Sequence, residues 1–579
     1  MIQNLETSNK KTSKSGGHVI AELIKQQGVK SVACLSGTAH TYLLLALEEL
    51  GVNIISSRHE TATVGIADGY ARVSGKPGFA LIKSDQGMPN AMTGIITANQ
   101  ACSPVIVLAS LSPDSKRESN DEWSNDWLDI VKPFVKWARV VPDVDRVEEF
   151  LNTALIQCCN GRPGVCVLGI PQHFESQATT NHSLNKNVYA KAGCPNEESL
   201  ENAAELLMSA KRPIIIAGSG AALSESGEIL QKIVKDFSIP ILGNSLGRGL
   251  VSEDMQLSFS WPLAQVSAKN ADIVLAVGIR LTQRLGYGLA PRFSSDAKFI
   301  QIDIHPEEIG RNRYVDVPLN GDARLTLESL YKILISKGMS PIINNDWFHK
   351  SLEPRLSRIK EVENEPADII HPYQLAREVV RQMPADSIYV GDGADIQNWM
   401  HAILRIKIKR GFLDHYPLGS MGIGTPLSIG AAVAARDNGS KSPVVLVTGD
   451  GAFGFYSFEL NALALSGIRI VCVISNDGAW GTEKHGQINA LGKSINCELG
   501  QWDYHLLANI FGGNGEKVSS INELKPALER AFKSKTFSVI NVITDPMAGL
   551  MRKKDPKLQM IAFEDLVTSL KTHYTPEVK

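Results

Sequence analysis

Short apolar runs recur along the chain, and each ends in a glycine-containing turn followed by helix-like periodicity. Because successive positions in a run are apolar, we expect strands buried on both faces, as in parallel sheets covered by helices. The pattern therefore predicts an α/β fold built from doubly wound parallel sheets. The runs that carry this prediction are 77–83, 104–110, 213–218, 272–278, 298–304, 443–449 and 469–475.

Two polar stretches without apolar periodicity interrupt this pattern. They cover 177–198 and 340–367, the second around a short helical piece, and both are typical of linkers. They predict three doubly wound α/β domains at 15–178, 195–340 and 368–550, each of the usual size for one domain.

Both ends of the chain are polar. Met1–Gly17 is rich in Ser, Lys and Thr and lacks the apolar core of a signal peptide, so we expect a disordered lead-in, with residues 1–14 outside the first domain. Residues 551–579 are expected to form a C-terminal tail, with a charged helical piece after Lys553.

Charge and composition exclude several classes of partner. The 579 residues carry a formal net charge of -2, which gives no electrostatic reason to expect nucleic acid or an anionic membrane. No apolar run approaches the roughly 20 residues that span a bilayer, so we expect no membrane segment. The 8 cysteines form no Cys-x-x-Cys pair, which favours reduced thiols in a cytoplasmic protein.

Two glycine-containing turns carry the strongest chemical signal. One strand leads into Gly-Asp-Gly-Ala-Phe-Gly at 449–454, and a later strand leads into Asn-Asp-Gly-Ala-Trp-Gly at 476–481. Both turns follow the carboxyl ends of strands, where open α/β sheets bind ligands.

The first turn matches the Gly-x-Gly-x-x-Gly pattern of dinucleotide sites, which is one interpretation. Asp450 argues against it, because a carboxylate inside the turn repels a diphosphate unless a cation lies between them. With Mg²⁺ present, Asp450, Asp477, a backbone carbonyl and two phosphate oxygens would fill most of an octahedron. We therefore prefer a metal–diphosphate site over a dinucleotide site and over a purely structural pair of turns.

The spacing of these residues resembles the motif of thiamine-diphosphate (ThDP) enzymes. The Gly-Asp-Gly turn is followed by 24 residues, 452–475, and then by Asn476-Asp477, with Asp where the family more often has Asn. The resemblance implies that Asp450, Asp477 and the Ala479 carbonyl bind Mg²⁺. It also implies that the residues around both turns bind the diphosphate, namely Gly449, Gly451, Ala452, Asp477 and Gly481.

A segment near the N-terminus, Val52–Gly78, also resembles the family. In the family this segment carries the glutamate that protonates the aminopyrimidine of ThDP, and Glu60 falls on that position. The alternative is a solvent-exposed glutamate at a helix start, which the helix dipole favours.

Two later segments complete the implied cofactor site. Pro417–Pro426 resembles the loop that wedges a large apolar residue between the cofactor rings, so Met421 matches the wedge and the Gly419 carbonyl an acceptor for the amino group. The alternative for Met421 is an ordinary core residue. Gly391–Trp399 resembles the loop over the diphosphate, in which the matching residues are Ala394, Asp395 and Ile396.

Within the family, the chain looks most like the acetolactate synthase group, which includes benzaldehyde lyase and 2-hydroxyacyl-CoA lyase. The resemblance implies a carboligase that decarboxylates a 2-keto acid to an enamine and transfers it to an acceptor carbonyl. The alternative within the group is a C–C lyase of the 2-hydroxyacyl-CoA or benzaldehyde type. The resemblance to the family also implies a homodimer or homotetramer, because in the family one subunit supplies the glutamate and another supplies the metal site.

Several candidate residues lie on the substrate side. Gln86 stands where the synthases carry a Gly-Pro-Gly turn, and Glu122-Trp123 stands where they carry Phe-Gln. His40 matches an active-site histidine of benzaldehyde lyase, and its alternative is a helix-start histidine bonded to a backbone carbonyl. His485 is a second proton-transfer candidate near the substrate, and its alternative is a surface residue.

Three further hypotheses stay open. Synthases of this group often bind FAD in the middle domain, but the middle domain of this chain resembles the acyl-CoA lyase more, so FAD is not favoured. An NAD-dependent Rossmann oxidoreductase would follow from the dinucleotide interpretation of the 449–454 turn. A non-catalytic protein of the ThDP fold is the third, and the joint presence of Glu60, Asp450 and Asp477 argues against it.

Overall fold

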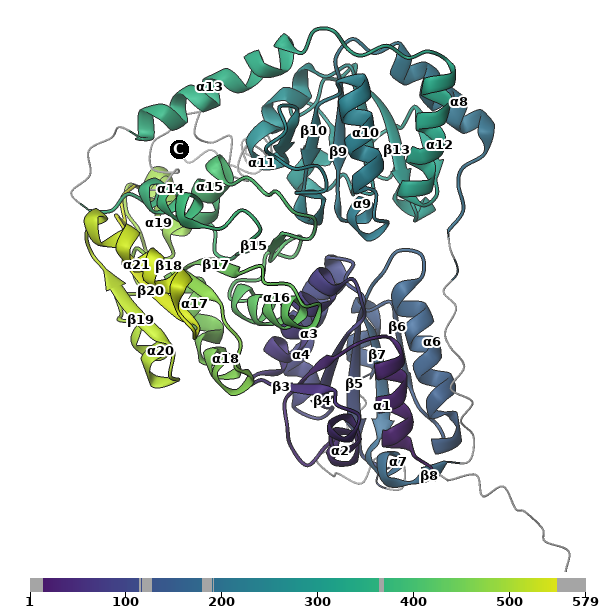
Figure 1. Cartoon of the computed structure of the whole chain (residues 1–579), viewed down its shortest axis with the longest axis vertical. Coiled ribbons are helices and arrows are strands. Elements are labelled where there is room, and N and C mark those ends of the chain that lie inside the picture. The colour runs from purple at the N-terminus through teal and green to yellow at the C-terminus, as the bar shows by residue number, and fades with distance from the viewer. Residues whose placement is uncertain are drawn as a thin grey trace, which may run out of the picture. The chain divides into compact units, whose positions relative to one another are not determined.

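The computed structural model of the chain describes residues 14–113, 116, 128–179, 190, 192–363 and 369–548 (Figure 1). These residues divide into two compact units, treated separately below. The first unit comprises Met1–Ala71 and Lys76–Tyr189, and the second comprises Arg72–Gly75 and Ala190–Lys579. The predicted residues Glu122 and Trp123, and the predicted tail at 551–579, lie outside the described residues.

The first unit contains a six-stranded sheet of order β3-β2-β4-β5-β7-β6, in which every pairing is parallel. Its central strands are apolar and buried at nearly every position, as the sequence predicted. The strands are β2 (Ser31–Cys34), β3 (Asn53–Ser56), β4 (Gly78–Lys83), β5 (Val105–Leu111), β6 (Trp137–Val140) and β7 (Cys166–Pro171). The main helices are α1 (Gly16–Gln26), α2 (Thr41–Glu49), α3 (Glu60–Ser74), α4 (Gly87–Gln100), α6 (Val147–Cys159) and α7 (Gln172–Ser176).

The first described residues form a short strand and a capped helix. Helix α1 begins at Gly16, and the Ser15 side chain caps it by accepting a hydrogen bond from the His18 backbone N–H. Just before it, β1 (Lys14–Ser15) pairs antiparallel with β8 (Ala178–Thr179), inside the first predicted linker. The polar composition concealed both features, because a cap and a two-residue strand need no apolar run.

The middle domain, in the second unit, contains a parallel sheet of order β11-β10-β9-β12-β13-β14 (Figure 1). Its strands are β9 (Pro213–Ala217), β10 (Ile241–Gly243), β11 (Ser258–Ser260), β12 (Ile273–Val277), β13 (Lys298–Asp303) and β14 (Val317–Asn320). One face packs against α8 (Glu197–Met208), α10 (Gly227–Phe237) and α12 (Ala323–Ser336). The other packs against α11 (Trp261–Ala264) and α13 (Asp346–Glu363).

Helix α13 is a correction to the second predicted linker. It contains 18 residues where we expected a short helical piece, and it packs Phe348 and Leu352 into the core. Arg355, also buried, donates to the backbone carbonyls of Pro262 and Leu263. The helix was hidden because few of its residues are apolar, and a polar side chain supplies part of the contact.

The C-terminal domain repeats the plan with a parallel sheet of order β16-β15-β17-β18-β20-β19. Its strands are β15 (Ile388–Gly391), β16 (Phe412–Asp414), β17 (Val444–Gly449), β18 (Val471–Asn476), β19 (Asn514–Val518) and β20 (Ser538–Ile543). Its helices include α14 (Pro372–Gln382), α15 (Asp395–Ile403), α16 (Gly424–Asp437), α17 (Asp450–Tyr456), α18 (Leu460–Ser466), α19 (Gly481–Leu491) and α21 (Ile521–Lys533).

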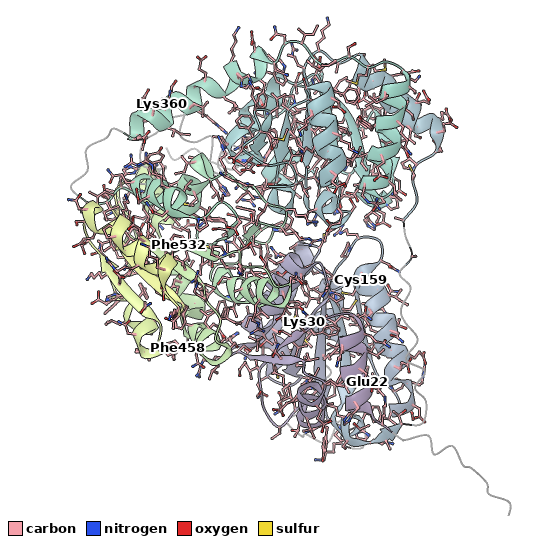
Figure 2. All side chains as sticks on the ribbon, viewed as in Figure 1. Glu22, Lys30, Cys159, Lys360, Phe458 and Phe532 are labelled. Carbon is pink, nitrogen blue, oxygen red and sulfur yellow. The ribbon has the colours of Figure 1, made fainter. Side chains whose placement is uncertain are left out.

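Three six-stranded parallel sheets with covering helices confirm the predicted fold class. Side chains fill the space between each sheet and its helices (Figure 2). The sheets fall inside the three predicted ranges, although the exact domain boundaries stay predictions. All 8 cysteines are free thiols. Within the described ranges, no helix combines the length and the apolar character that crossing a membrane requires.

Candidate cofactor and metal site

The two turns predicted to bind a metal and a diphosphate lie at adjacent strand ends. Strands β17 and β18 are parallel neighbours, with Gly449 opposite Ser475. Asp450 is the first residue of α17, directly after β17, and Asp477 follows β18. Parallel register therefore brings the two carboxylates to the same edge of the sheet.

Asp450 and Asp477 are buried side by side, in a place that disfavours the ionisation of both acids at once. Burial and the neighbouring charge of Asp477 raise the pKa of Asp450 to about 8, and burial also raises the pKa of Asp477. The Asp450 Oδ2 atom is buried and accepts no hydrogen bond from the described part of the chain. Two buried acidic groups side by side, one with an oxygen that has no hydrogen-bond partner among the described residues, are typical of a site that receives a cation.

The donor set fits a hard cation such as Mg²⁺. No three His, Cys, Asp or Glu side chains gather as a metal site within the described residues. Two carboxylates alone leave an octahedral ion short of ligands, so backbone carbonyls, water and ligand oxygens would have to complete it. The assignment of Asp450, Asp477 and the Ala479 carbonyl as the metal ligands stays a prediction.

Glycines let the backbones of three loops approach one another at this edge. Gly393 has a left-handed φ of +82°, and a Cβ atom there would lie 3.0 Å from the Gly449 backbone nitrogen. A Cβ atom on Gly481, the first residue of α19, would collide with the Asp477 carboxylate. The structure thus brings together the predicted turns 449–452 and 476–481 and the predicted loop 394–396.

The amino ends of α15 and α19 lie at the carboxyl ends of β15 and β18, in the same sheet. Ala394 stands just before α15, and Asp395 and Ile396 form its first turn. The first amide groups of a helix lack intrahelical acceptors, so helix starts that share one sheet edge favour an anion such as a diphosphate.

The loop predicted to hold the cofactor rings follows β16. Gly419 and Gly422 have left-handed φ values of +82° and +86°, which glycine adopts without strain. Met421 is half-buried and is not part of the core, and neighbouring Leu418 is exposed. Met421 is therefore not an ordinary core methionine, which was the alternative.

Glu60, in the first unit, begins α3 at the end of the turn that follows β3. Its side chain is buried, with 7% exposed, which differs from the exposed helix-start glutamate considered as the alternative. Asn90 Nδ2 donates to Glu60 Oε2 at 3.0 Å. A Cβ atom on Gly87 would lie 3.4 Å from Glu60 Oε1, so that oxygen faces a residue without a side chain.

Gln86 is exposed and directly precedes Gly87, so it lies in the turn beside Glu60. Its backbone N–H donates to Asp85 Oδ1 at 2.8 Å, and Lys83 forms an ion pair with the same carboxylate at 2.5 Å. Asp85 and Lys83 therefore fix the turn that presents Gln86.

His40 is enclosed in the core of the first unit. Its Nδ1 atom lies 2.6 Å from Glu175 Oε1, and its Nε2 atom lies 3.0 Å from the Ile82 carbonyl and 3.2 Å from the Leu108 carbonyl. Burial alone would lower the pKa of His40, but Glu175 and the carbonyls outweigh it and raise the pKa. The proton-transfer role of His40 stays a prediction, and the geometry supports the alternative, a helix-start histidine bonded to carbonyls.

His485 is buried in the first turns of α19, four residues after Gly481. The surface position considered as its alternative is therefore not observed. Its predicted role in proton transfer stays a prediction.

The sequence also contained a signal that we did not use. Asp392 lies in a second Gly-Asp-Gly turn, at the end of β15, and is buried with four hydrogen-bond donors around its carboxylate. The repeated tripeptide was visible at 391–393. Asn90, which bonds Glu60, had no such signal, because it is separated from Glu60 by 30 positions.

The domains match known families in the same order. Residues 14–132 match "Thiamine pyrophosphate enzyme, N-terminal TPP binding domain", residues 200–330 match the central domain of the same enzymes, and residues 392–542 match their C-terminal TPP binding domain. The chain is 30% identical over 545 residues to a probable acetolactate synthase of Mycobacterium bovis, which covers 93% of this chain and 97% of that protein.

Two other relatives carry different names. A 2-hydroxyacyl-CoA lyase of Mus musculus is 28% identical over 553 residues, with 92% of this chain and 94% of the relative covered. An oxalyl-CoA decarboxylase of Escherichia coli is 28% identical over 548 residues, with 92% and 95% covered. The similarity thus extends over nearly the full length of relatives whose names denote a synthase, a lyase and a decarboxylase.

Proposed function

Because the chain belongs to the thiamine pyrophosphate (ThDP) enzyme family, we propose that it is a Mg²⁺-dependent carboligase of the acetolactate synthase type. It would decarboxylate a 2-keto acid and transfer the remaining acyl unit to an acceptor carbonyl. The observation that carries the proposal is the buried pair Asp450 and Asp477, with an Asp450 oxygen that accepts no hydrogen bond from the described residues.

The proposed cofactor contacts follow from the loops at this sheet edge. Asp450, Asp477 and the Ala479 carbonyl would hold Mg²⁺, and the backbone of 394–396, 449–452 and 481 would hold the diphosphate. Gly419 and Met421 would contact the two rings. When bound, ThDP supplies the electron sink that C–C bond cleavage and formation require.

Glu60 is the proposed acid that exchanges a proton with the aminopyrimidine. Asn90 Nδ2 bonds its Oε2 atom, which leaves Oε1, beside Gly87, to donate to or accept from a ligand. Burial removes water that would compete for this proton transfer. His485 is the proposed group for proton transfer to the substrate, because it is buried close to the 476–481 turn.

Replacement of Glu60 tests the proposal directly. In Glu60→Gln, exchange of the thiazolium C2 proton of ThDP for deuterium, followed by proton NMR, should fall by at least about 100-fold. Glu48→Gln is the matched control, because Glu48 is an exposed glutamate on α2 in the same unit. Wild-type exchange rates in Glu60→Gln would refute the assignment.

A second candidate reaction is favoured by the relatives. The names of two full-length relatives denote a 2-hydroxyacyl-CoA lyase and an oxalyl-CoA decarboxylase, so C–C cleavage without ligation is the alternative outcome. Incubation with pyruvate should yield acetolactate and CO₂ if the carboligase proposal is right. Cleavage of a 2-hydroxyacyl-CoA, with no product from pyruvate, would favour the lyase instead.

We also propose a homodimer or homotetramer in which one subunit supplies Glu60 and another supplies Asp450. If so, co-expressed Glu60→Gln and Asp450→Ala chains, each inactive alone, should recover about one quarter of wild-type activity through mixed dimers. No recovery would contradict a shared site.

The free thiols support a reducing compartment such as the cytoplasm.

A further inference from the structure

A buried carboxylate lies between two of the proposed cofactor loops. Asp392, 1% exposed, directly follows β15. Its Oδ1 atom accepts from the Gly393 N–H at 2.7 Å, from His415 Nδ1 at 3.2 Å and from the Gly422 N–H at 3.3 Å, and its Oδ2 atom accepts from the Gly424 N–H at 2.8 Å. Ionised Asp is acceptor-only, so all four contacts are satisfied when His415 carries its proton on Nδ1.

Three of these donors belong to the segment that carries Gly419 and Met421. His415 precedes the two residues, and Gly422 and Gly424 follow them. The Gly419 N–H donates to the His415 carbonyl at 3.0 Å, which closes the loop on itself. One carboxylate therefore holds both ends of the loop that is proposed to contact the cofactor rings.

The loop passes too close to Asp392 for a side chain. A Cβ atom on Gly424 would lie 2.5 Å from the Asp392 Cβ atom, and Gly422 has a left-handed backbone. Glycine at both positions allows the backbone N–H groups to reach the carboxylate. Two of the three contacts from this segment are thus made by backbone N–H groups, and the third is made by the His415 side chain.

The backbone of Asp392 also fixes the proposed diphosphate loop. Its N–H donates to the Val447 carbonyl at 3.0 Å, and its carbonyl accepts from Gln397 Nε2 at 3.0 Å. Gln397 Nε2 also donates to the Val447 carbonyl, and Gln397 Oε1 accepts from Tyr389 Oη. Asp392 is therefore tied to the strands on one side and to the 417–424 loop on the other.

We propose that Asp392 is the positioning residue that holds the 417–424 loop in register with the 394–396 loop, and so sets where Gly419 and Met421 stand relative to a bound cofactor. The cofactor part of this inference rests on the proposed function. The positioning part concerns only contacts within the second unit, and it can be measured without a ligand.

Asp392→Asn tests the requirement for a carboxylate. The amide has one oxygen, so whichever way it turns, its NH₂ group faces an N–H donor and that contact is lost. Hydrogen–deuterium exchange of the ligand-free full-length protein should become about 10- to 100-fold faster at 419–424, because charge-assisted bonds to backbone N–H groups are broken. The kcat should fall by a similar factor, because the misplaced loop no longer aligns the rings. The KM for ThDP should change about threefold or less, because the metal and diphosphate contacts remain.

Asp272→Asn is the matched control. Asp272, in the middle domain, accepts from the backbone N–H groups of Lys211 and Arg212 at 2.9 Å each, so it is also a carboxylate that joins two segments. Its replacement should speed exchange at 211–212 and leave both kcat and exchange at 419–424 unchanged. A general effect of losing a carboxylate would appear in both variants.

His415→Leu gives a second test if Asp392→Asn does not fold. It removes one donor and keeps the carboxylate, so exchange at 419–424 should rise by about threefold to tenfold. Unchanged exchange at 419–424 in a folded variant would overturn the inference. So would a kcat loss accompanied by an equal loss of ThDP affinity, because a residue that only positions the rings leaves the diphosphate anchor intact.

Failure of the proposed function is distinguished by the wild-type protein. If calorimetry with ThDP and Mg²⁺ shows no binding to the wild type, the cofactor assignment fails. The exchange experiment still decides whether Asp392 holds the loop, because it uses the protein without ligand.

Discussion

The same tripeptide, Gly-Asp-Gly, ends two neighbouring strands of the C-terminal domain, and its aspartates have opposite surroundings. Strands β15 and β17 pair in parallel, so Asp392 and Asp450 follow equivalent ends. Asp392 accepts hydrogen bonds from four donors, whereas a buried oxygen of Asp450 accepts none from the described residues. The Asp392 carboxylate is saturated by donors within the protein, whereas Asp450, beside a second acid, is the residue that we propose to bind a cation.

The difference comes from the residues around each turn. After Asp392 the backbone turns left-handed at Gly393, and the segment after β16 supplies N–H groups to the carboxylate. Helix α17 instead starts directly at Asp450, and the neighbouring strand β18 delivers a second carboxylate, Asp477. A short motif therefore does not determine its own role, because the adjacent strands decide whether it meets donors or another acid.

Removal of the cation is expected to have the largest effect. Asp450→Ala, or treatment of the wild type with EDTA, should abolish ThDP binding by calorimetry and reduce activity by about 1000-fold or more. The variant would lose a carboxylate of the proposed Mg²⁺ site, and EDTA would remove the ion itself. Asp386→Ala, at an exposed aspartate of the same domain, is the control. Retained ThDP affinity in Asp450→Ala would show that the pair is not the metal site.

In the ligand-free protein, replacing the two aspartates by asparagine should change the stability in opposite directions. Asp450→Asn should raise the apparent stability by about 1–2 kcal/mol, because it removes one of two mutually repelling buried acids. Asp392→Asn should lower it by about 2–3 kcal/mol, because backbone donors lose a charged acceptor. Thermal unfolding without Mg²⁺ or ThDP measures both changes. A loss of stability in both variants would remove the contrast between the turns.

In the first unit, the buried acid Glu175 has a third kind of surroundings, because it pairs with His40. The pKa of His40 is raised above its ordinary value of 6.5, so the folded state holds its proton more tightly than the unfolded chain. The stabilisation is therefore fully present below the unfolded pKa and is lost as the pH rises through the folded pKa. Burial raises the pKa of nearby Cys34 to about 12, so its thiol stays neutral in this window.

His40→Asn measures that stabilisation. Asparagine tolerates the left-handed backbone of His40, with its φ of +61°, but it is too short to reach all the acceptors. The melting-temperature deficit of the variant should be larger at acidic than at alkaline pH, because the wild type loses the stabilisation as the pH rises through the folded pKa of His40. A deficit that does not change with pH would mean that the imidazole is not charged in the folded protein.

Much of the fold was predictable from the sequence because parallel strands are buried on both faces, and such runs are visible without knowledge of their partners. The position of Asp450 and Asp477 at strand ends was predictable for a related reason, since both residues directly follow such runs. Helix α13 was not, because buried Arg355 and two apolar residues supply much of its packing.

The environment of each candidate side chain was less predictable. The sequence named His40 as a candidate but could not show that Glu175, 135 positions away, would bond its imidazole. It did not single out Asp392, whose carboxylate is saturated by a loop 23 to 32 positions away. Satisfaction of a polar group depends on contacts that are distant in sequence. Motifs in the sequence therefore identified Glu60, Asp450 and Asp477, but not the hydrogen-bond partners of the candidate side chains.

The smallest expected effect tests the backbone at the two turns. Gly393→Ala should destabilise the protein by about 1–2 kcal/mol, because alanine resists a φ of +82°. Gly439→Ala isolates this strain, because Gly439 also has a positive φ of +72° but has nothing within 4 Å of its Cβ position. The difference between the two variants, a few tenths of a kcal/mol, then reports the contact of the new methyl group with the Gly449 nitrogen.

Gly451→Ala should behave differently from both. Gly451 lies within helix α17 and has no positive φ, so alanine gains about 1 kcal/mol in helix propensity. Its Cβ atom would lie 2.6 Å from the Trp480 ring, which must move, and the ring stands in the 476–481 turn. We therefore expect little change in the melting temperature of the ligand-free protein but a several-fold loss of ThDP affinity. Gly393→Ala should instead lower the melting temperature more than the ThDP affinity, because the hydrogen bonds of its turn are made within the protein.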